Sequence, residues 1–202
     1  MTEADRAGPD LERSALKEWA VLVEAMAGGS IVAMVRKGGI REQRKGFSVR
    51  HDRFLLYPTY FHEKPAELAA RFRDRLDAAH ATRPPEGRVR VEYVCDVVGV
   101  WAVAELERLA AVEDQHGLAP AAVASRFHYK DRPGVQVVAV RAKRLPQAVE
   151  VPELRRYAGC VSWVELDGAV DVAGASPVLP EAELARRVAA ITAALGRPAS
   201  SL

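Results

Sequence analysis

The apolar positions of the chain follow two periods, and each period predicts a different kind of element. Between residues 10 and 27 they recur at steps of three and four, which predicts a helix. This stripe consists of Leu16, Trp19, Ala20, Val23 and Met26. Residues 88–97 alternate instead, which predicts a half-buried strand. Its expected buried face carries Val89, Val91, Tyr93, Cys95 and Val97.

Shorter runs predict the remaining elements. Apolar and β-branched runs predict further strands at 31–35, 54–57, 135–144 and 161–166. Further helices are expected at 65–79, 102–112, 120–125 and 181–195. Because strands do not alternate regularly with helices, the order favours an α+β fold over a doubly wound one. We expect a mixed, curved or barrel-like sheet with flanking helices.

The length of 202 residues indicates one domain, which we expect to span 14–196. Polar segments containing Gly and Pro predict a disordered lead over 1–13 and a disordered tail over 197–202. No run of about 18 apolar residues predicts a membrane span. The polar start is unlike a secretory signal, and the two cysteines form no disulfide framework. These features predict a cytoplasmic protein without membrane contact.

Cations gather in two segments, although the net charge is only +2. Residues 36–53 hold seven cations against two acids, and residues 126–144 hold six against one. Aromatic side chains are interleaved in both. Cations bind phosphates and flat rings stack on bases, so the pattern favours a nucleic-acid surface. The alternative is a pair of solvated strand edges, which Lys and Arg protect from aggregation.

No motif for metal or nucleotide-cofactor chemistry is complete. The Walker and Rossmann patterns are both missing. The five histidines offer no compact set of metal ligands, so we expect neither metal nor cofactor. His62 and His128 lie among aromatic residues. Each is either an acid–base group at neutral pH or a packed, satisfied histidine.

Four segments, taken in order, resemble the uncharacterised bacterial family known as domain of unknown function 1802. They are Ala15–Ala20, Arg36–Ile40, Arg53–Tyr60 and Tyr157–Val164, so the likeness covers about residues 14–166. Members of this family are sometimes joined to a restriction-endonuclease catalytic domain. The resemblance therefore implies a role in DNA recognition or defence, with a restriction-type nuclease as partner.

A looser likeness is to the PUA-like group of base-reading barrels, which includes the ASCH and EVE domains. There a tryptophan-bearing helix precedes a glycine turn and a strand that ends in basic residues. Trp19, Gly28-Gly29 and Arg36-Lys37 fill those places here. This is an analogy of fold pattern, and fold does not settle function.

The leading hypothesis is a module that binds DNA, RNA or a nucleotide. Its expected ligand-binding residues are Arg36, Lys37, Gly38, Gly39, Arg53, Tyr57, Thr59, His62, Arg126 and Trp163. Arg36 and Lys37 would meet phosphates, and Gly38 and Gly39 would let the backbone approach the ligand. Tyr57, Tyr60 or Trp163 would stack a base, while Thr59 or His62 would bond its edge.

Other interpretations stay open. Core packing is the favoured alternative for Tyr57 and Trp163, and a structural ion pair is the alternative for Arg53. The protein could instead be an enzyme acting on nucleic acid or a nucleotide through His62 or His128, or a scaffold or regulatory protein. The binding hypothesis expects one concave face to gather Arg36, Lys37, Arg53, Tyr57 and His62.

Overall fold

The computed structural model describes residues 9–37, 51–129, 132–159 and 161–199, and its centre is one seven-stranded mixed sheet. The strands are β1 (Leu11–Trp19), β2 (Ala33–Arg36), β3 (Arg53–Thr59), β4 (Arg88–Val103), β5 (Val135–Pro152), β6 (Trp163–Asp171) and β7 (Ser176–Pro177). Their order is β2-β5-β4-β3-β1-β6, and β7 pairs with β5. β1 and β3 run parallel, whereas the other pairs are antiparallel.

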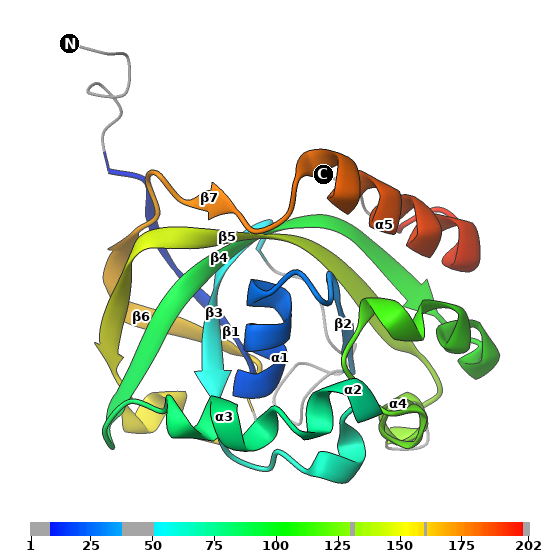
Figure 1. Ribbon diagram of the computed structural model, residues 1–202, viewed down its shortest axis with the longest axis horizontal. Helices are drawn as coiled ribbons and strands as arrows, with labels where there is room; N and C mark the ends of the chain where they lie inside the picture. The colour runs from blue at the N-terminus through cyan, green and yellow to red at the C-terminus, as the bar shows by residue number, and fades with distance from the viewer. Residues whose placement is uncertain (1–8, 38–50, 130–131, 160, 200–202) are drawn as a thin grey trace.

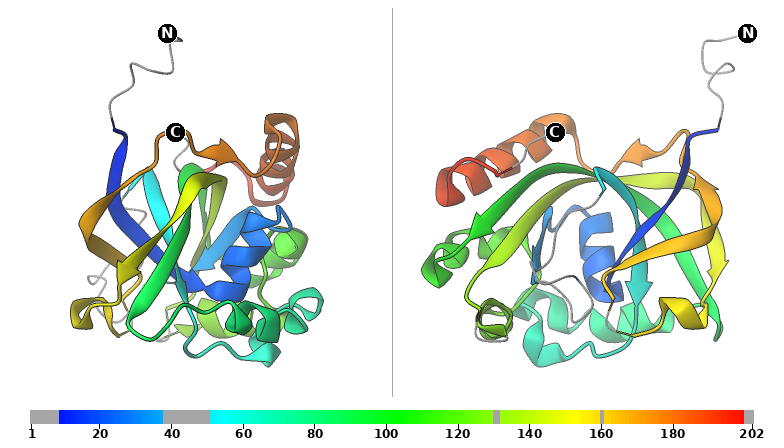
Figure 2. Two further views of the ribbon diagram at one scale, coloured as in Figure 1. Left: turned by 60° about the vertical axis from the view of Figure 1, so that its left-hand side comes forward. Right: turned by 180° about the vertical axis from the view of Figure 1, so that it is seen from behind.

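Helices lie on both sides of this sheet. They are α1 (Ala20–Ala27), α2 (Ala70–Arg73), α3 (Leu76–Ala81), α4 (Pro120–Phe127) and α5 (Glu181–Leu195), with 3₁₀ helices η2 (Pro65–Glu67), η3 (Leu106–Gln115) and η5 (Arg155–Tyr157). The long strands β4 and β5 arch over α1, which lies inside the curve (Figure 1). α2 and α3 lie below the arch and α5 lies outside it, as the view from behind also shows (Figure 2). None of the described helices is long and apolar enough to cross a bilayer.

The curved sheet separates two apolar cores, and β3 contributes to both. Phe54 and Leu56 pack into the larger core with α1 and β2, whereas Leu55 and Tyr57 pack into the smaller core. The smaller core is enclosed because the chain after β6 pairs with β5 through β7. Alternation along a strand explains how neighbouring residues reach opposite cores.

The α+β fold with a curved sheet and flanking helices is confirmed. All five predicted strands are present, and β4 and β5 are longer than expected. The helix predicted at 181–195 has the same bounds in α5, and that at 120–125 is found in α4.

The helix predicted over 10–27 is wrong in its first half, which forms β1. Pairing decides this conformation, since β1 lies between β3 and β6 and buries Ala15 and Leu16 on opposite faces. A helical period over so few residues cannot outweigh two neighbouring strands. β1 also takes in Leu11–Arg13, which the sequence analysis assigned to a disordered lead. At the other end, the Ala199 N–H donates to the Val100 carbonyl at 2.7 Å.

Two other predicted helices are also corrected. The segment 65–79 is broken because Leu68 is extended and bridges to Leu118. The segment 102–112 begins as strand, since β4 stays paired with β5 as far as Val103, and then continues as η3. In both cases pairing with a distant segment overrides the local apolar period.

Candidate functional site

Arg36, expected to meet phosphates, points instead into the protein. Its Nη1 donates to Glu18 Oε2 and to the Lys17 carbonyl, each at 3.2 Å. The side chains of Arg36 and Glu18 are only 11% and 4% exposed. A phosphate role for Arg36 therefore has no support from this geometry. Gly38 and Gly39 lie outside the described residues.

Lys37 is likewise engaged by the protein. Its Nζ donates to the carbonyls of Phe127 at 2.9 Å and Gly134 at 2.6 Å, and also to that of Arg132. Burial, with the Arg132 charge, lowers the pKa of Lys37. The ammonium thus ties the end of β2 to both ends of the connection between α4 and β5.

Thr59 and Arg126 belong to the same internal cluster around Glu18. The Thr59 hydroxyl donates to the Glu18 carbonyl at 3.2 Å. Arg126 donates to the Val35 carbonyl at 2.9 Å, and its guanidinium carbon lies 5.3 Å from the centre of the Trp19 ring. Burial lowers the pKa of Arg126. These contacts fasten α4 to β2 and β1 rather than offering charge to a ligand.

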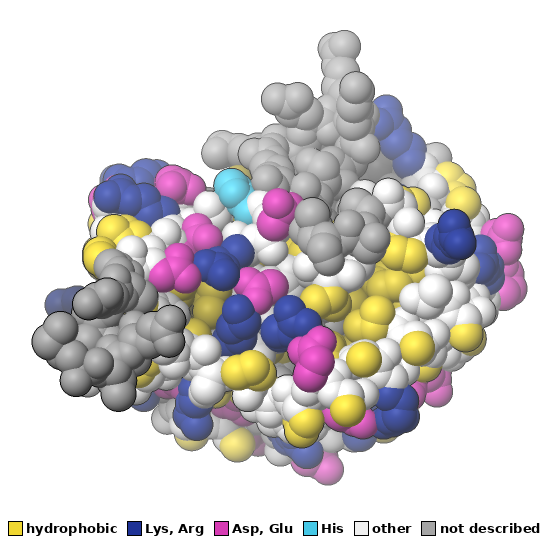
Figure 3. Space-filling view, turned by 90° about the horizontal axis from the view of Figure 1, so that it is seen from above, with side chains coloured by type: hydrophobic (Ala, Val, Ile, Leu, Met, Phe, Trp, Pro, Cys, Tyr) yellow, Lys and Arg dark blue, Asp and Glu magenta, His cyan; other side chains and the backbone are white. Residues whose placement is uncertain are grey.

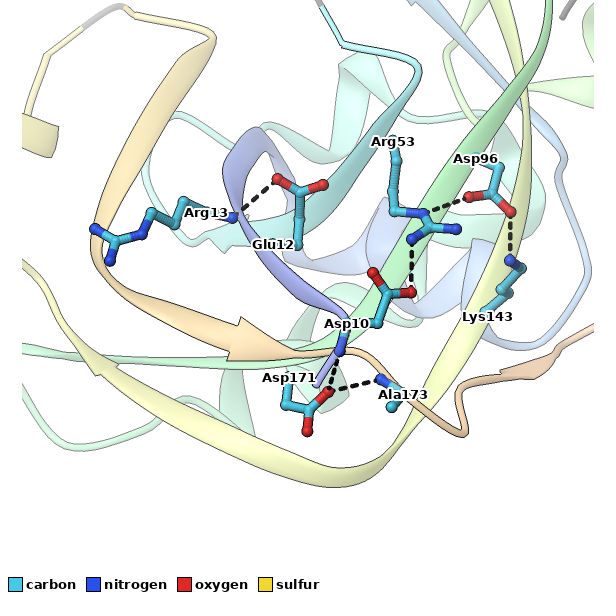
Figure 4. Close-up of polar contacts among 8 residues, drawn as sticks. All are labelled: Asp10, Glu12, Arg13, Arg53, Asp96, Lys143, Asp171 and Ala173. Atoms are coloured by element: carbon cyan, nitrogen blue, oxygen red, sulfur yellow. Dashed lines mark hydrogen bonds and ion pairs between the residues drawn. The ribbon is translucent and has the colours of Figure 1, made fainter. Parts of the chain in front are cut away.

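Arg53 forms the structural ion pair that the sequence left open. It donates to Asp10 Oδ2 at 2.8 Å and to Asp96 Oδ1 at 3.0 Å, while Lys143 meets the other oxygen of Asp96 at 2.5 Å (Figure 4). Burial works to raise the pKa of Asp96, but the hydrogen bonds from Lys143 and Arg53 lower it overall. The group joins β3, β4, β5 and the start of β1.

The two predicted stacking residues differ from one another. Tyr57 is 1% exposed, lies in the smaller core, and cannot stack a base. Trp163 is half-buried, with its ring 5.2 Å from that of Phe54 and 5.1 Å from that of His51. Arg53 and Thr59 also stand at opposite ends of β3, about 20 Å apart at 3.3 Å per residue. The expected residues therefore do not converge on one concave face.

Three of the six cations of the second basic segment, 126–144, pair with acids from elsewhere in the chain, namely Arg141, Lys143 and Arg144. Arg141 pairs with Glu181 at 2.6 Å, and Arg144 lies 3.8 Å from Glu92. Seen from above, basic and acidic side chains alternate across the middle of the surface (Figure 3). Among the described residues on this face, the cations form no patch of one sign.

The structure instead assembles a pocket between α1, β3, β4 and the end of α3, with a volume of about 100 Å³. We call it the Tyr60 pocket. Its lining residues are Ala20, Val23, Glu24, Ala27, Leu56, Pro58, Tyr60, Thr82, Arg90, Glu92 and Tyr93. It therefore combines apolar walls with two carboxylates, two phenols, a hydroxyl and a guanidinium.

The carboxylates of the Tyr60 pocket make few contacts with the described residues, and these contacts are long. The Thr82 hydroxyl donates to Glu24 Oε1 at 3.4 Å. Glu92 lies 3.9 Å from Arg90 and 3.8 Å from Arg144, distances that make ion pairs but not hydrogen bonds. Burial raises the pKa of Glu24, and nearby carboxylates add to the effect. Both groups retain lone pairs for a donor.

Aromatic rings and a guanidinium flank the mouth of the pocket. The Arg83 guanidinium carbon lies 5.3 Å from the centre of the Tyr60 ring and 5.0 Å from that of Phe61. Phe61 is 56% exposed. Burial raises the pKa of Tyr60, as does the charge of Glu24, so this phenol is neutral at pH 7.

Two of the described histidines, His62 and His80, lie near this mouth, but neither lines the pocket. His62 is exposed and follows Phe61, with a left-handed φ of 62°. His80 packs edge-on against Tyr60 and its Nε2 bonds to the carboxylate of Glu63. His128 is exposed at the end of α4. Within the described residues no cluster of three His, Cys, Asp or Glu side chains could hold a metal ion.

Most of the pocket residues are not among those that the sequence pattern indicated. Glu24 is one signal that could have found them, since it is the single charged residue of the otherwise apolar α1. Arg83 is a second, because it follows the helix end and precedes two prolines that fix the loop. Glu92 gave no signal, since an acid on the polar face of an alternating strand is ordinary.

Two solved structures resemble the chain in fold. None of the curated proteins matches it in sequence. Among solved structures, the crystal structure of ASCH from Zymomonas mobilis is 11% identical, with 87% of this chain and 92% of that chain covered and a TM-score of 0.42. A serine-to-alanine mutant of the Zymomonas mobilis protein is 11% identical, with 90% and 98% covered and a TM-score of 0.43. These are ASCH proteins, the group to which the sequence showed a looser likeness, but similarity at this level carries no argument about function.

The family assignment rests on sequence. A family model described as a domain of unknown function (DUF1802) matches residues 15–190, which include the four segments that resembled it. The match spans well over half of the chain, from β1 into α5. The chain therefore belongs to the DUF1802 family.

Proposed function

We propose that this chain is a single-stranded nucleic-acid-binding module that receives a base at the Tyr60 pocket. The observation that carries the proposal is the stack of Arg83 over Tyr60 and Phe61 at the mouth of this pocket. Exposed aromatic rings bind bases through their faces, and every base can be stacked in this way.

Phe61 is a large apolar side chain that is exposed to solvent, which is unusual in this structure. Among the described residues the large apolar side chains that are exposed are Leu11, Phe61 and Tyr129. Phe61 stands beside a pocket with apolar walls and under a guanidinium, which is a common arrangement for stacking ligands. A ligand base would cover the ring and remove its apolar surface from water.

Cations at the rim support binding of the backbone. Arg83 is exposed, and the side chains of Arg90 and Arg144 are 47% and 65% exposed. The acidic partners of Arg90 and Arg144 lie at 3.6–3.9 Å, so phosphates can compete for these guanidinium groups. We therefore assign phosphate binding to these rim arginines rather than to Arg36 and Lys37. Such a module would supply the recognition part of a restriction or defence system, with a separate nuclease as partner.

Fluorescence polarisation with labelled ten-nucleotide strands tests the proposal across a salt series. We expect single-stranded DNA or RNA to bind more tightly than duplex, with affinity falling linearly in a log–log plot against salt. Arg83→Ala should weaken binding about tenfold because it removes both charge and stacking. Arg186→Ala on α5, whose side chain is 70% exposed, is the matched control and should leave affinity unchanged. No binding to any strand at low salt would contradict the proposal.

A further inference from the structure

We infer further that the Tyr60 pocket selects a base carrying an exocyclic amino group, and cytosine in particular, over a base with a carbonyl at that position. This inference rests on the proposed function, since it concerns which base the pocket accepts. It comes from the donors and acceptors that line the pocket rather than from the charge at its mouth.

The polar groups of the pocket are mainly acceptors. Glu24 and Glu92 line it from α1 and β4, and an ionised carboxylate accepts hydrogen bonds without donating any. The described contacts to these carboxylates are one hydroxyl at 3.4 Å and two ion pairs longer than 3.5 Å. An amino group of a ligand would therefore meet carboxylate oxygens that hold no short hydrogen bond from the described residues.

The remaining lining suits a flat ring. Ala20, Val23 and Ala27 on one side and Leu56 and Pro58 on the other provide apolar walls. Tyr60 and Tyr93 are phenols whose pKa values are raised, first of all by burial, so both stay neutral. Neutral rings and apolar walls receive an uncharged heterocycle at lower cost than a charged group.

Cytosine fits this arrangement better than uracil. Its amino group would donate to Glu24 or Glu92, and its carbonyl at position 2 would accept from Arg90, which also lines the pocket. Uracil has the same ring shape but places a carbonyl where cytosine has the amino group. Two acceptors would then face each other, and the half-buried carboxylate would lack the donor that cytosine offers at this position. Uracil also has an N–H at position 3, where cytosine has an acceptor, so the discrimination requires the carboxylates to face the group at position 4 of the ring.

The test compares ten-nucleotide strands of deoxycytidine and deoxyuridine, whose bases differ at that amino group and in the proton that uracil carries at position 3. We expect the cytosine strand to bind at least about tenfold more tightly at equal salt. Glu24→Gln and Glu92→Gln should shrink this ratio, since the amide offers a donor as well as an acceptor. Glu107→Gln, on the exposed surface of η3, is the matched control and should leave the ratio unchanged. Thermal unfolding of each variant establishes that it is folded.

The possible outcomes separate the two proposals. Equal binding of both strands, weakened by Arg83→Ala, would overturn base selection and leave nucleic-acid binding in place. A cytosine preference that survives both glutamine variants would overturn the assignment to this pocket. Failure of both strands to bind would overturn the proposed function and this inference with it.

Discussion

Arg36 Nη1 lies 3.2 Å from Glu18 Oε2, and this ion pair joins two strands that are not neighbours in the sheet. β2 stands at one end of the strand order and β1 is next to the other end, with three strands between them. The pair can form because the sheet curves until the two strands approach each other. A residue that the sequence offered as a phosphate contact thereby becomes part of the interior.

Removing the cation of this pair should be costly. Arg36→Met leaves the Glu18 carboxylate buried without its partner, so we expect the unfolding free energy to fall by about 3–5 kcal/mol. Urea denaturation measures the change. Arg36→Met combined with Glu18→Gln should recover a large part of the loss, because neither charge of the pair then remains. A single variant as stable as the parent would show that the pair is not a structural contact.

Tyr57 allows a separate test of the stacking role. Its hydroxyl is buried and has no hydrogen-bond partner among the described residues. Tyr57→Phe removes this polar atom and keeps the ring, so stability should stay unchanged or rise by up to about 1 kcal/mol. Nucleic-acid affinity should stay the same, because the side chain lies in the smaller core. Loss of affinity in a stably folded Tyr57→Phe protein would restore the stacking role that the sequence suggested.

Stability should depend on pH through His116. Burial, followed by the charges of Arg71 and Arg126, lowers the pKa of His116 to about 4. The unfolded chain takes up this proton near pH 6.5, so the folded state loses stability as the pH falls from 6.5 to 4. The loss should reach about 3 kcal/mol, at about 1.4 kcal/mol per pH unit.

Denaturation at several pH values measures this loss, and a substitution isolates its origin. His116 Nδ1 accepts the Leu118 N–H at 3.2 Å, and asparagine can accept the same bond without titrating. His116→Asn should therefore flatten the pH dependence over this range. His62→Asn changes an exposed histidine and should leave the profile as it is. A parent protein equally stable at about pH 4.5 and 6.5 would be incompatible with a buried neutral His116.

Phe61 separates binding from folding. It is 56% exposed, so Phe61→Ala should change the unfolding free energy by less than about 0.5 kcal/mol. Affinity for single strands should nevertheless drop by about tenfold, since a stacking ring is worth about 1–3 kcal/mol per base. Leu11→Ala, which removes a similarly exposed apolar side chain from β1, is the control for polarisation measurements. If both variants bind like the parent, the aromatic mouth has no part in recognition.

The sequence by itself determined most of the strands and the last helix. Residues 88–97 alternate, and burial of Val89, Val91 and Cys95 follows from that period alone. α5 has the predicted bounds because its apolar stripe faces one side and needs little from distant segments. The α+β class followed from the order of these elements, and the family resemblance followed from four short segments.

Tertiary structure decided β1, the roles of the cations and the position of the candidate site. β1 has a helical period, but pairing with β3 and β6 made it a strand. Nothing in the sequence distinguishes Arg36, Lys37 and Arg126 from cations that bind phosphates. Whether a cation meets solvent or a carbonyl depends on which strands the curved sheet brings together.

The Tyr60 pocket is the clearest case of this division. Its residues come from α1, β3, β4 and the end of α3, and nothing in their sequence spacing relates Glu24 to Glu92. The sequence supplied the chemical groups, an acid inside an apolar helix and two neighbouring aromatic residues. Only the folding of β4 over α1 placed them around one cavity, because long-range strand pairing sets distances that local patterns do not contain.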